Sequence, residues 1–180
     1  FAAMRGRWPA DRPMSVRISA ADWADGGLSE EDCFAIARAF SEAGCDLIDV
    51  STGQTVPSQA PVYGRMYQVP FAEALKNELG LKTMCVGAIT EWGQVNTIVS
   101  CRRADLVAVG RPHLTDPMWS LRGAAWYGVK AVRPPAPYLS GAAQLLRESE
   151  KTRDKQTELQ RKAKPKRHHK VAPILKAAAE

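Results

Sequence analysis

Features that define several common classes of protein are scarce or missing in this 180-residue sequence. The four cysteines form no Cys-x-x-Cys pair and no Cys/His metal spacing, so we predict reduced thiols, a cytoplasmic protein and no metal site. No run of about 18 apolar residues is present, which argues against a membrane-spanning helix. A phosphate-binding Gly-x-x-x-x-Gly-Lys-Ser/Thr loop, a Ser/His/Asp set and paired-carboxylate spacing are also lacking.

The chain starts at Phe1, without methionine or an apolar leader, and we expect it to begin inside a larger protein. Residues 1–146 contain 14 basic and 14 acidic side chains, whereas residues 147–180 contain 11 and 5, so the net charge of +6 lies in the tail. The basic cluster at 164–170 could contact RNA, membrane phosphates or an acidic partner. A solvated tail is the favoured interpretation, and we expect neither a nucleic acid nor a membrane as partner.

Short apolar runs alternate with amphipathic segments along the first three quarters of the chain. The runs at 15–20, 47–51, 83–89 and 106–110 are typical of strands in a parallel sheet. Helices are predicted between and after them, over residues 28–43, 69–79, 91–100 and 117–127. This order predicts an α/β fold, either a small doubly wound sheet or half of an eight-unit barrel.

We therefore divide the sequence into a partial (β/α)₈ domain at 1–143 and a charged, basic tail at 144–180. Large apolar residues are sparse in this tail, which predicts a frayed helix or a disordered segment. In a half-barrel the inner faces of the strands, which we place around Ile18, Ile48, Cys85 and Val107, would be exposed to water.

Glycine and arginine residues at strand ends are the clearest candidates for a binding site. Gly110 and Arg111 end the fourth run and Gly87 lies near the end of the third, which suits a phosphate held by backbone N–H groups and a guanidinium. Alternatively, the glycines form turns and Arg111 caps a helix or pairs with an aspartate, either Asp105 or Asp116. Arg17 is a charge within an apolar strand and needs a ligand or a carboxylate partner.

The carboxylate partner of Arg17 would be Asp22 or Asp49, and for Asp49 the ion-pair interpretation is favoured. A ligand beside Arg17 could be a reduced flavin, because its N1–C2=O edge gains negative charge.

Consecutive motifs of this sequence resemble the Old Yellow Enzyme family of NADH:flavin oxidoreductases, especially its bacterial NADPH dehydrogenases and xenobiotic reductases. The resemblance covers about residues 4–140 and rests on Val16-Arg17-Ile18-Ser19-Ala20, Asp25-Gly26-Gly27-Leu28, Asp46-Leu47-Ile48-Asp49-Val50-Ser51, Tyr67-Gln68-Val69-Pro70-Phe71-Ala72-Glu73, Val86-Gly87-Ala88-Ile89-Thr90 and Ala104-Asp105-Leu106-Val107-Ala108-Val109-Gly110-Arg111. Other stretches, including Ser51-Thr52-Gly53-Gln54-Thr55, are similar to the C-terminal domain of salicylyl-CoA 5-hydroxylase and anthraniloyl-CoA monooxygenase.

The resemblance implies strands five to eight of a TIM barrel that binds FMN and takes hydride from NAD(P)H. It implies that Arg17 faces the flavin pyrimidine edge and that Gly87, Gly110 and Arg111 hold the phosphate. The family's substrate-anchoring pair and proton-donating tyrosine belong to strand four, so no catalytic residue is predicted here. The partners implied are an aromatic acyl-CoA substrate and the missing half of the barrel or a second copy; a non-catalytic half-barrel or a structural remnant is the alternative.

Overall fold

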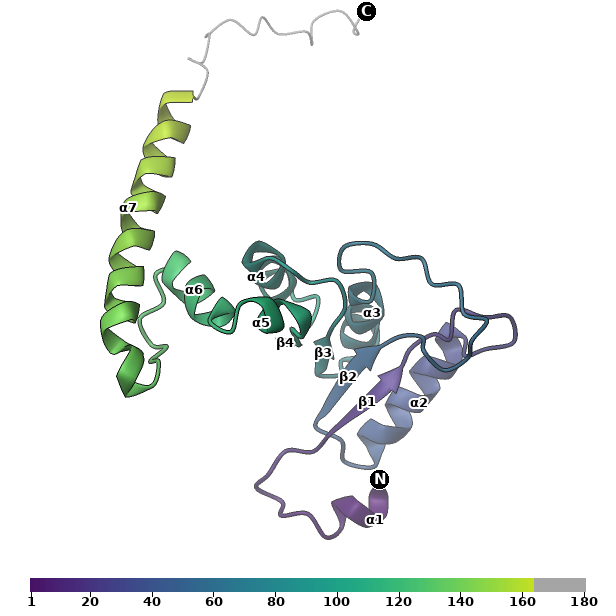
Figure 1. Cartoon of the computed structure of the whole chain (residues 1–180). Helices are drawn as coiled ribbons and strands as arrows, with labels where there is room; N and C mark the ends of the chain where they lie inside the picture. The colour runs from purple at the N-terminus through teal and green to yellow at the C-terminus, as the bar shows by residue number, and fades with distance from the viewer. Residues whose placement is uncertain (164–180) are drawn as a thin grey trace, which may run out of the picture. The chain divides into compact units, whose positions relative to one another are not determined.

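The chain divides into two compact units, Phe1–Pro117 and Met118–Glu180, and the computed structural model describes residues 1–163. Figure 1 shows the helices and strands of each unit. The basic cluster at 164–170 lies outside the described residues. None of the helices in the described part is long and apolar enough to cross a membrane.

The first unit contains a four-stranded parallel sheet with the strand order β1-β2-β3-β4. The strands are β1 (Ser15–Ser19), β2 (Leu47–Ser51), β3 (Thr83–Cys85) and β4 (Leu106–Val107). Because neighbours in the sheet are also neighbours in sequence, right-handed crossovers place the connecting helices on one face. This order is that of a partial (β/α)₈ barrel, whereas a doubly wound sheet reverses its strand order part-way.

Local sequence signals explain the helices that cover this face. In α2 (Glu30–Glu42), Ser29 and Asp32 form a capping box at the start of the helix predicted over residues 28–43. A left-handed Gly80, with φ of 68°, ends α3 (Val69–Leu79), as predicted. A second capping box, made by Glu91 and Gln94, begins α4 (Trp92–Ser100).

The two faces of the sheet differ in their surroundings. Side chains of one face pack against the helices and are buried, among them Ile18, Ile48 and Cys85, which are 7%, 2% and 0% exposed. The prediction that Ile18, Ile48, Cys85 and Val107 lie on an open inner face is therefore wrong, because this side of the sheet packs against the helices, and Val107, the register partner of Cys85, packs against the same core. The open face belongs to the alternate positions of the strands, which include the paired row Arg17, Asp49, Met84 and Leu106.

The third and fourth strands are shorter than the apolar runs predict. After Cys85 the backbone turns through two residues with positive φ, Gly87 at 108° and Ala88 at 49°, which ends the ladder. Gly110 is followed directly by α5 (Arg111–Thr115), a short helix that the sequence pattern did not predict, as it did not predict α1 (Ala2–Arg5).

The second unit is helical over its described residues. It contains α6 (Trp119–Trp126), a 3₁₀ turn η1 (Ala136–Tyr138) and α7 (Leu139–Ala163). The guanidinium of Arg153 donates a 2.6 Å hydrogen bond to the carbonyl of Trp126, so α7 satisfies the end of α6. Residues 144–163 of the predicted tail are thus helical, and the proposed domain boundary at 143 stays a prediction.

Candidate functional site

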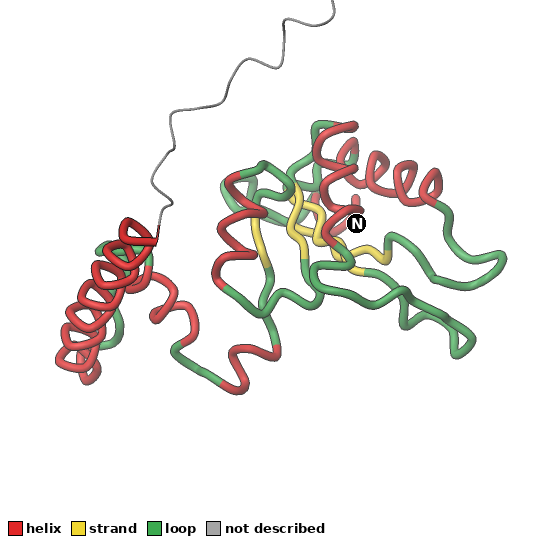
Figure 2. The backbone as a smooth tube through the Cα atoms, turned by 90° about the horizontal axis from the view of Figure 1, so that it is seen from above, coloured by secondary structure: helices red, strands yellow, loops and turns green. Residues whose placement is uncertain are grey.

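The loops that follow the carboxyl ends of β2, β3 and β4 enclose a cleft of about 660 Å³. In parallel α/β folds this end of the sheet is where ligands bind, because the loops there converge from several strands. The long connection from β2 to α3 leaves this end of the sheet (Figure 2). Most of the residues that line the cleft belong to this connection. The lining residues are Thr52, Gln54, Gln59, Pro61, Tyr63, Gly64, Arg65, Tyr67, Ala88, Thr90 and Arg111.

Two arginines line this cleft, and they differ in how their charges are balanced. Arg65 forms a 2.9 Å ion pair with Glu91. Arg111 is exposed and forms no ion pair within residues 1–163, so its charge remains available to an anion. The alternative pairing of Arg111 with Asp105 does not occur.

Asp105 is instead held by another basic side chain at the opposite end of the strands. Its carboxylate accepts hydrogen bonds from the Lys76 ammonium and, at 2.9 Å, from the N–H of Thr83. Burial raises the pKa of Asp105, but these bonds outweigh burial, and its pKa lies below the ordinary value. Asp105 therefore has a structural role between α3 and β3.

Position 87 requires glycine because of both its backbone conformation and the atoms around it. Its φ of 108° is one that side-chain-bearing residues rarely adopt, and a Cβ there would lie 2.8 Å from Cδ of Gln68. The Gln68 amide is buried and donates a 2.8 Å hydrogen bond to the Tyr67 hydroxyl. Gln68 thus packs directly against the loop that follows β3.

Gly110 presents the opposite situation. Its φ is −102°, and a Cβ built on it would meet no heavy atom within 4 Å. The described chain itself does not require glycine at this position. A ligand that approaches the backbone closely at this position would require glycine.

Arg17 lies outside the cleft lining, on the open face of the sheet. Its Nε donates a 2.7 Å hydrogen bond to Oδ2 of Asp49, its register partner on β2. The predicted ion pair is therefore made with Asp49. Asp22 instead accepts hydrogen bonds from the Thr55 hydroxyl and the Leu28 N–H, which hold the pKa of Asp22 below its usual value.

Several cleft residues were not predicted from the sequence. Tyr63 and Tyr67 form an edge-to-face pair with ring centroids 5.3 Å apart, and Arg65 lies between them in sequence. Their positions follow no periodic pattern. The signal that could have identified them is the length of the connection at 52–68, because long loops without secondary structure are often functional.

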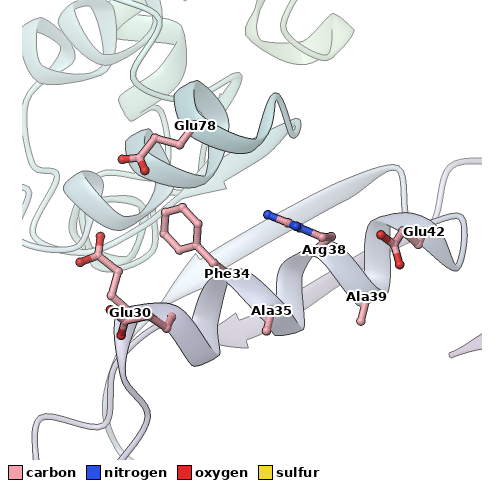
Figure 3. Close-up of a pocket in the computed structure, with 8 residues that line it drawn as sticks. Glu30, Phe34, Ala35, Arg38, Ala39, Glu42 and Glu78 are labelled. Atoms are coloured by element: carbon pink, nitrogen blue, oxygen red, sulfur yellow. The ribbon is translucent and has the colours of Figure 1, made fainter.

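A second hollow of about 730 Å³ lies along α2 (Figure 3). Its lining includes Glu30 and Glu78 on the side of Phe34, Glu42 at the other end of α2, and Arg38 as the basic group. Carboxylates in this number would repel a phosphate. We therefore place the candidate site at the strand ends and not on α2. No group of three or more metal-ligating side chains is present in the described part of the chain.

Comparison with known proteins adds to this geometry. The family model described as NADH:flavin oxidoreductase / NADH oxidase matches residues 3–125. The chain belongs to this family. Similar proteins include the NADPH dehydrogenases of Geobacillus thermodenitrificans, 42% identical over 132 residues, and of Halalkalibacterium halodurans, 42% identical over 124 residues. These alignments cover 73% and 69% of this chain, but 38% and 36% of the relatives.

The match confirms the predicted Old Yellow Enzyme-like family of NADH:flavin oxidoreductases. The chain spans little more than a third of the length of these curated relatives. The observed parallel sheet with sequential strands agrees with part of the barrel expected for the family.

Proposed function

We propose that this chain supplies the C-terminal half, strands five to eight, of an FMN-binding NAD(P)H oxidoreductase barrel. The proposal is supported by four sequential parallel strands with one helix-covered face. It is also supported by the share of the relatives that the chain matches, 38% of the length of the Geobacillus thermodenitrificans protein. Within residues 1–163 no strand pairs with the outer edges of β1 and β4. Such edges are normally covered, which fits a barrel completed by the missing half or by a second copy.

The residues present are suited to FMN. Arg111 offers an uncompensated guanidinium within the cleft, and the space beside Gly110 allows an anion to approach the backbone. Gly87 shapes the neighbouring loop. We assign these three residues to the FMN phosphate, and the single observation that carries the assignment is the unpaired Arg111 in the cleft at the strand ends.

When bound, FMN would accept hydride from NAD(P)H and pass it on. The role of this chain is to bind and orient that group and to place positive charge where negative charge develops. Arg17, on the open face, is assigned to the flavin pyrimidine edge. The catalytic acid and the substrate-anchoring pair would come from strand four, which this chain does not contain.

We further propose an aromatic acyl-CoA as substrate and a monooxygenase-linked role in aromatic metabolism. This finer assignment rests on the motif resemblance of residues 51–55 and on the tyrosine pair at the cleft. Aromatic side chains at a cleft mouth suit a planar ring. The alternative, a non-catalytic half-barrel that holds a phosphate-bearing ligand, predicts bound FMN that NAD(P)H does not bleach.

Arg111→Ala in the complete protein tests the assignment, with Arg65→Ala as the matched control. A charge-assisted bond to phosphate contributes about 1.5 to 3 kcal/mol, so Arg111→Ala should weaken FMN binding roughly ten- to hundredfold. Arg65 is already paired with Glu91, so Arg65→Ala should weaken FMN binding less than Arg111→Ala does. The measurement is FMN retained after gel filtration; equal retention by both variants and wild type would refute the phosphate assignment.

A further inference from the structure

The Arg17–Asp49 pair differs from the other ion pairs of the first unit in where its two charges lie. The two residues are register partners on β1 and β2, so the backbone ladder fixes their spacing. A single hydrogen bond joins them, from Nε of Arg17 to Oδ2 of Asp49 at 2.7 Å. The pair stands on the open face of the sheet, on the row that also contains Met84 and Leu106.

Burial is strongly asymmetric within this pair. The Asp49 side chain is 11% exposed, whereas that of Arg17 is 56% exposed. A buried carboxylate is costly unless it is paired and hydrogen-bonded, and Oδ1 of Asp49 is buried without a partner in the described chain. A carboxylate that is buried with one oxygen unpartnered is a poor source of stability, which points to another role for Asp49.

The geometry of the contact indicates what that role is. A guanidinium presents its N–H groups in a rigid planar fork. Because Asp49 takes only the Nε side, the Nη1 and Nη2 groups of Arg17 have no partner among residues 1–163. They therefore remain free to donate to a ligand over the open face.

We propose that Asp49 is a positioning residue, which holds Arg17 by its Nε so that the two Nη groups face the flavin. This inference rests on the proposed function. Asp49 acts through Arg17, and its effect should therefore appear in the stabilisation of reduced over oxidised flavin. That quantity is measured by the flavin reduction potential.

The test compares Asp49→Asn with Asp49→Ala in the complete FMN-loaded protein. Both substitutions remove the negative charge, but only asparagine keeps an oxygen that accepts the Nε–H. We expect Asp49→Ala to have the lower potential, by about tenfold in the affinity ratio of reduced to oxidised flavin, which is about 30 mV for a two-electron couple. In an Arg17→Met background this difference should vanish.

Two further variants complete the design. Asp46→Asn removes a carboxylate that accepts from Arg5 and from Met14 at the amino end of β2, and it should leave the potential unchanged. Asp49→Glu keeps the charge but shifts the acceptor by one methylene, and it should lower the potential even if Asp49→Ala fails to fold.

Equal potentials for Asp49→Asn and Asp49→Ala, or a difference that persists without Arg17, would overturn the inference while leaving the proposed function intact. An unchanged potential in Asp49→Glu would overturn it in the same way. Wild-type protein that binds no FMN would overturn both.

Discussion

Replacing Gly87 by alanine tests whether the loop after β3 depends on the contact with Gln68. Two costs add at this position. A φ of 108° is unfavourable for alanine by about 1 to 3 kcal/mol. The new Cβ would also lie 2.8 Å from Cδ and 3.0 Å from Cγ of Gln68, so the buried amide would have to move and lose its bond to Tyr67, at about 1 kcal/mol.

Gly80→Ala provides the matched control. Gly80 also has a positive φ, 68°, but a Cβ there would meet nothing within 4 Å. Gly80→Ala should therefore lower the free energy of unfolding only through its unfavourable φ, by about 1 kcal/mol. Gly87→Ala should lower it by about 3 kcal/mol. Shortening the neighbour in the double variant Gly87→Ala/Gln68→Ser should recover part of the difference.

The assay is equilibrium unfolding in urea followed by circular dichroism at low protein concentration. An unchanged dependence on urea together with a lower midpoint would identify a change in stability. If both alanine variants lower the midpoint equally, or if Gln68→Ser recovers nothing, packing of Gln68 against Gly87 does not hold the loop.

Three other predictions concern burial of Cys85 in the first unit and packing of α6 against α7 in the second. Burial raises the pKa of the Cys85 thiol to about 11 from 9.0, so iodoacetamide at pH 8 should modify the exposed Cys101 first, as peptide mass spectrometry would show. The Cys85 thiol ionises at a lower pH in the unfolded chain than in the folded one. The stabilisation that comes from the protonated thiol in the folded chain is therefore complete below pH 9 and is lost between pH 9 and 11, so the free energy of unfolding should fall over this range. Cys85→Ala should make that fall shallower. Gly128→Ala should loosen α6 from α7 by about 1 to 2 kcal/mol, since φ is 71° and the Cβ would lie 3.3 Å from Nη1 of Arg153; a melting temperature equal to wild type would contradict it.

Much of the fold could be predicted because local signals and hydrophobic pattern agree. The capping box of Ser29, the stop at Gly80 and the apolar strands all mark elements that the structure contains. The sequence did not predict which side of the sheet packs against the helices. Ile18, Ile48 and Cys85 are apolar, and their alternation alone does not say whether the helix side or the barrel interior receives them.

The candidate site was predicted only where it coincides with strand ends. Arg111 directly follows the fourth apolar run and Gly87 lies near the end of the third, so their positions could be inferred. Arg65 and Tyr63 reach the cleft through the irregular connection at 52–68, whose path depends on contacts distant in sequence, such as the hydrogen bond from Thr55 to Asp22. No periodic pattern records a path of that kind.

The correction of strand orientation also changes what the isolated chain exposes. Ile18, Ile48 and Cys85 are covered by helices, and the open face instead presents Arg17 and the half-exposed Leu106. We therefore predict that the isolated chain self-associates through the edges of β1 and β4, which are unpaired within residues 1–163, and not through a broad apolar surface.

The most direct test of the half-barrel proposal is gel filtration of the 180-residue chain with FMN, followed by an assay of NAD(P)H oxidation. The chain is tested alone and after co-expression with the amino-terminal half of a related NADPH dehydrogenase. We predict self-association without stoichiometric FMN or turnover for the chain alone, and a yellow complex that NAD(P)H bleaches after co-expression. A monodisperse monomer that binds FMN stoichiometrically and oxidises NAD(P)H by itself would contradict the account.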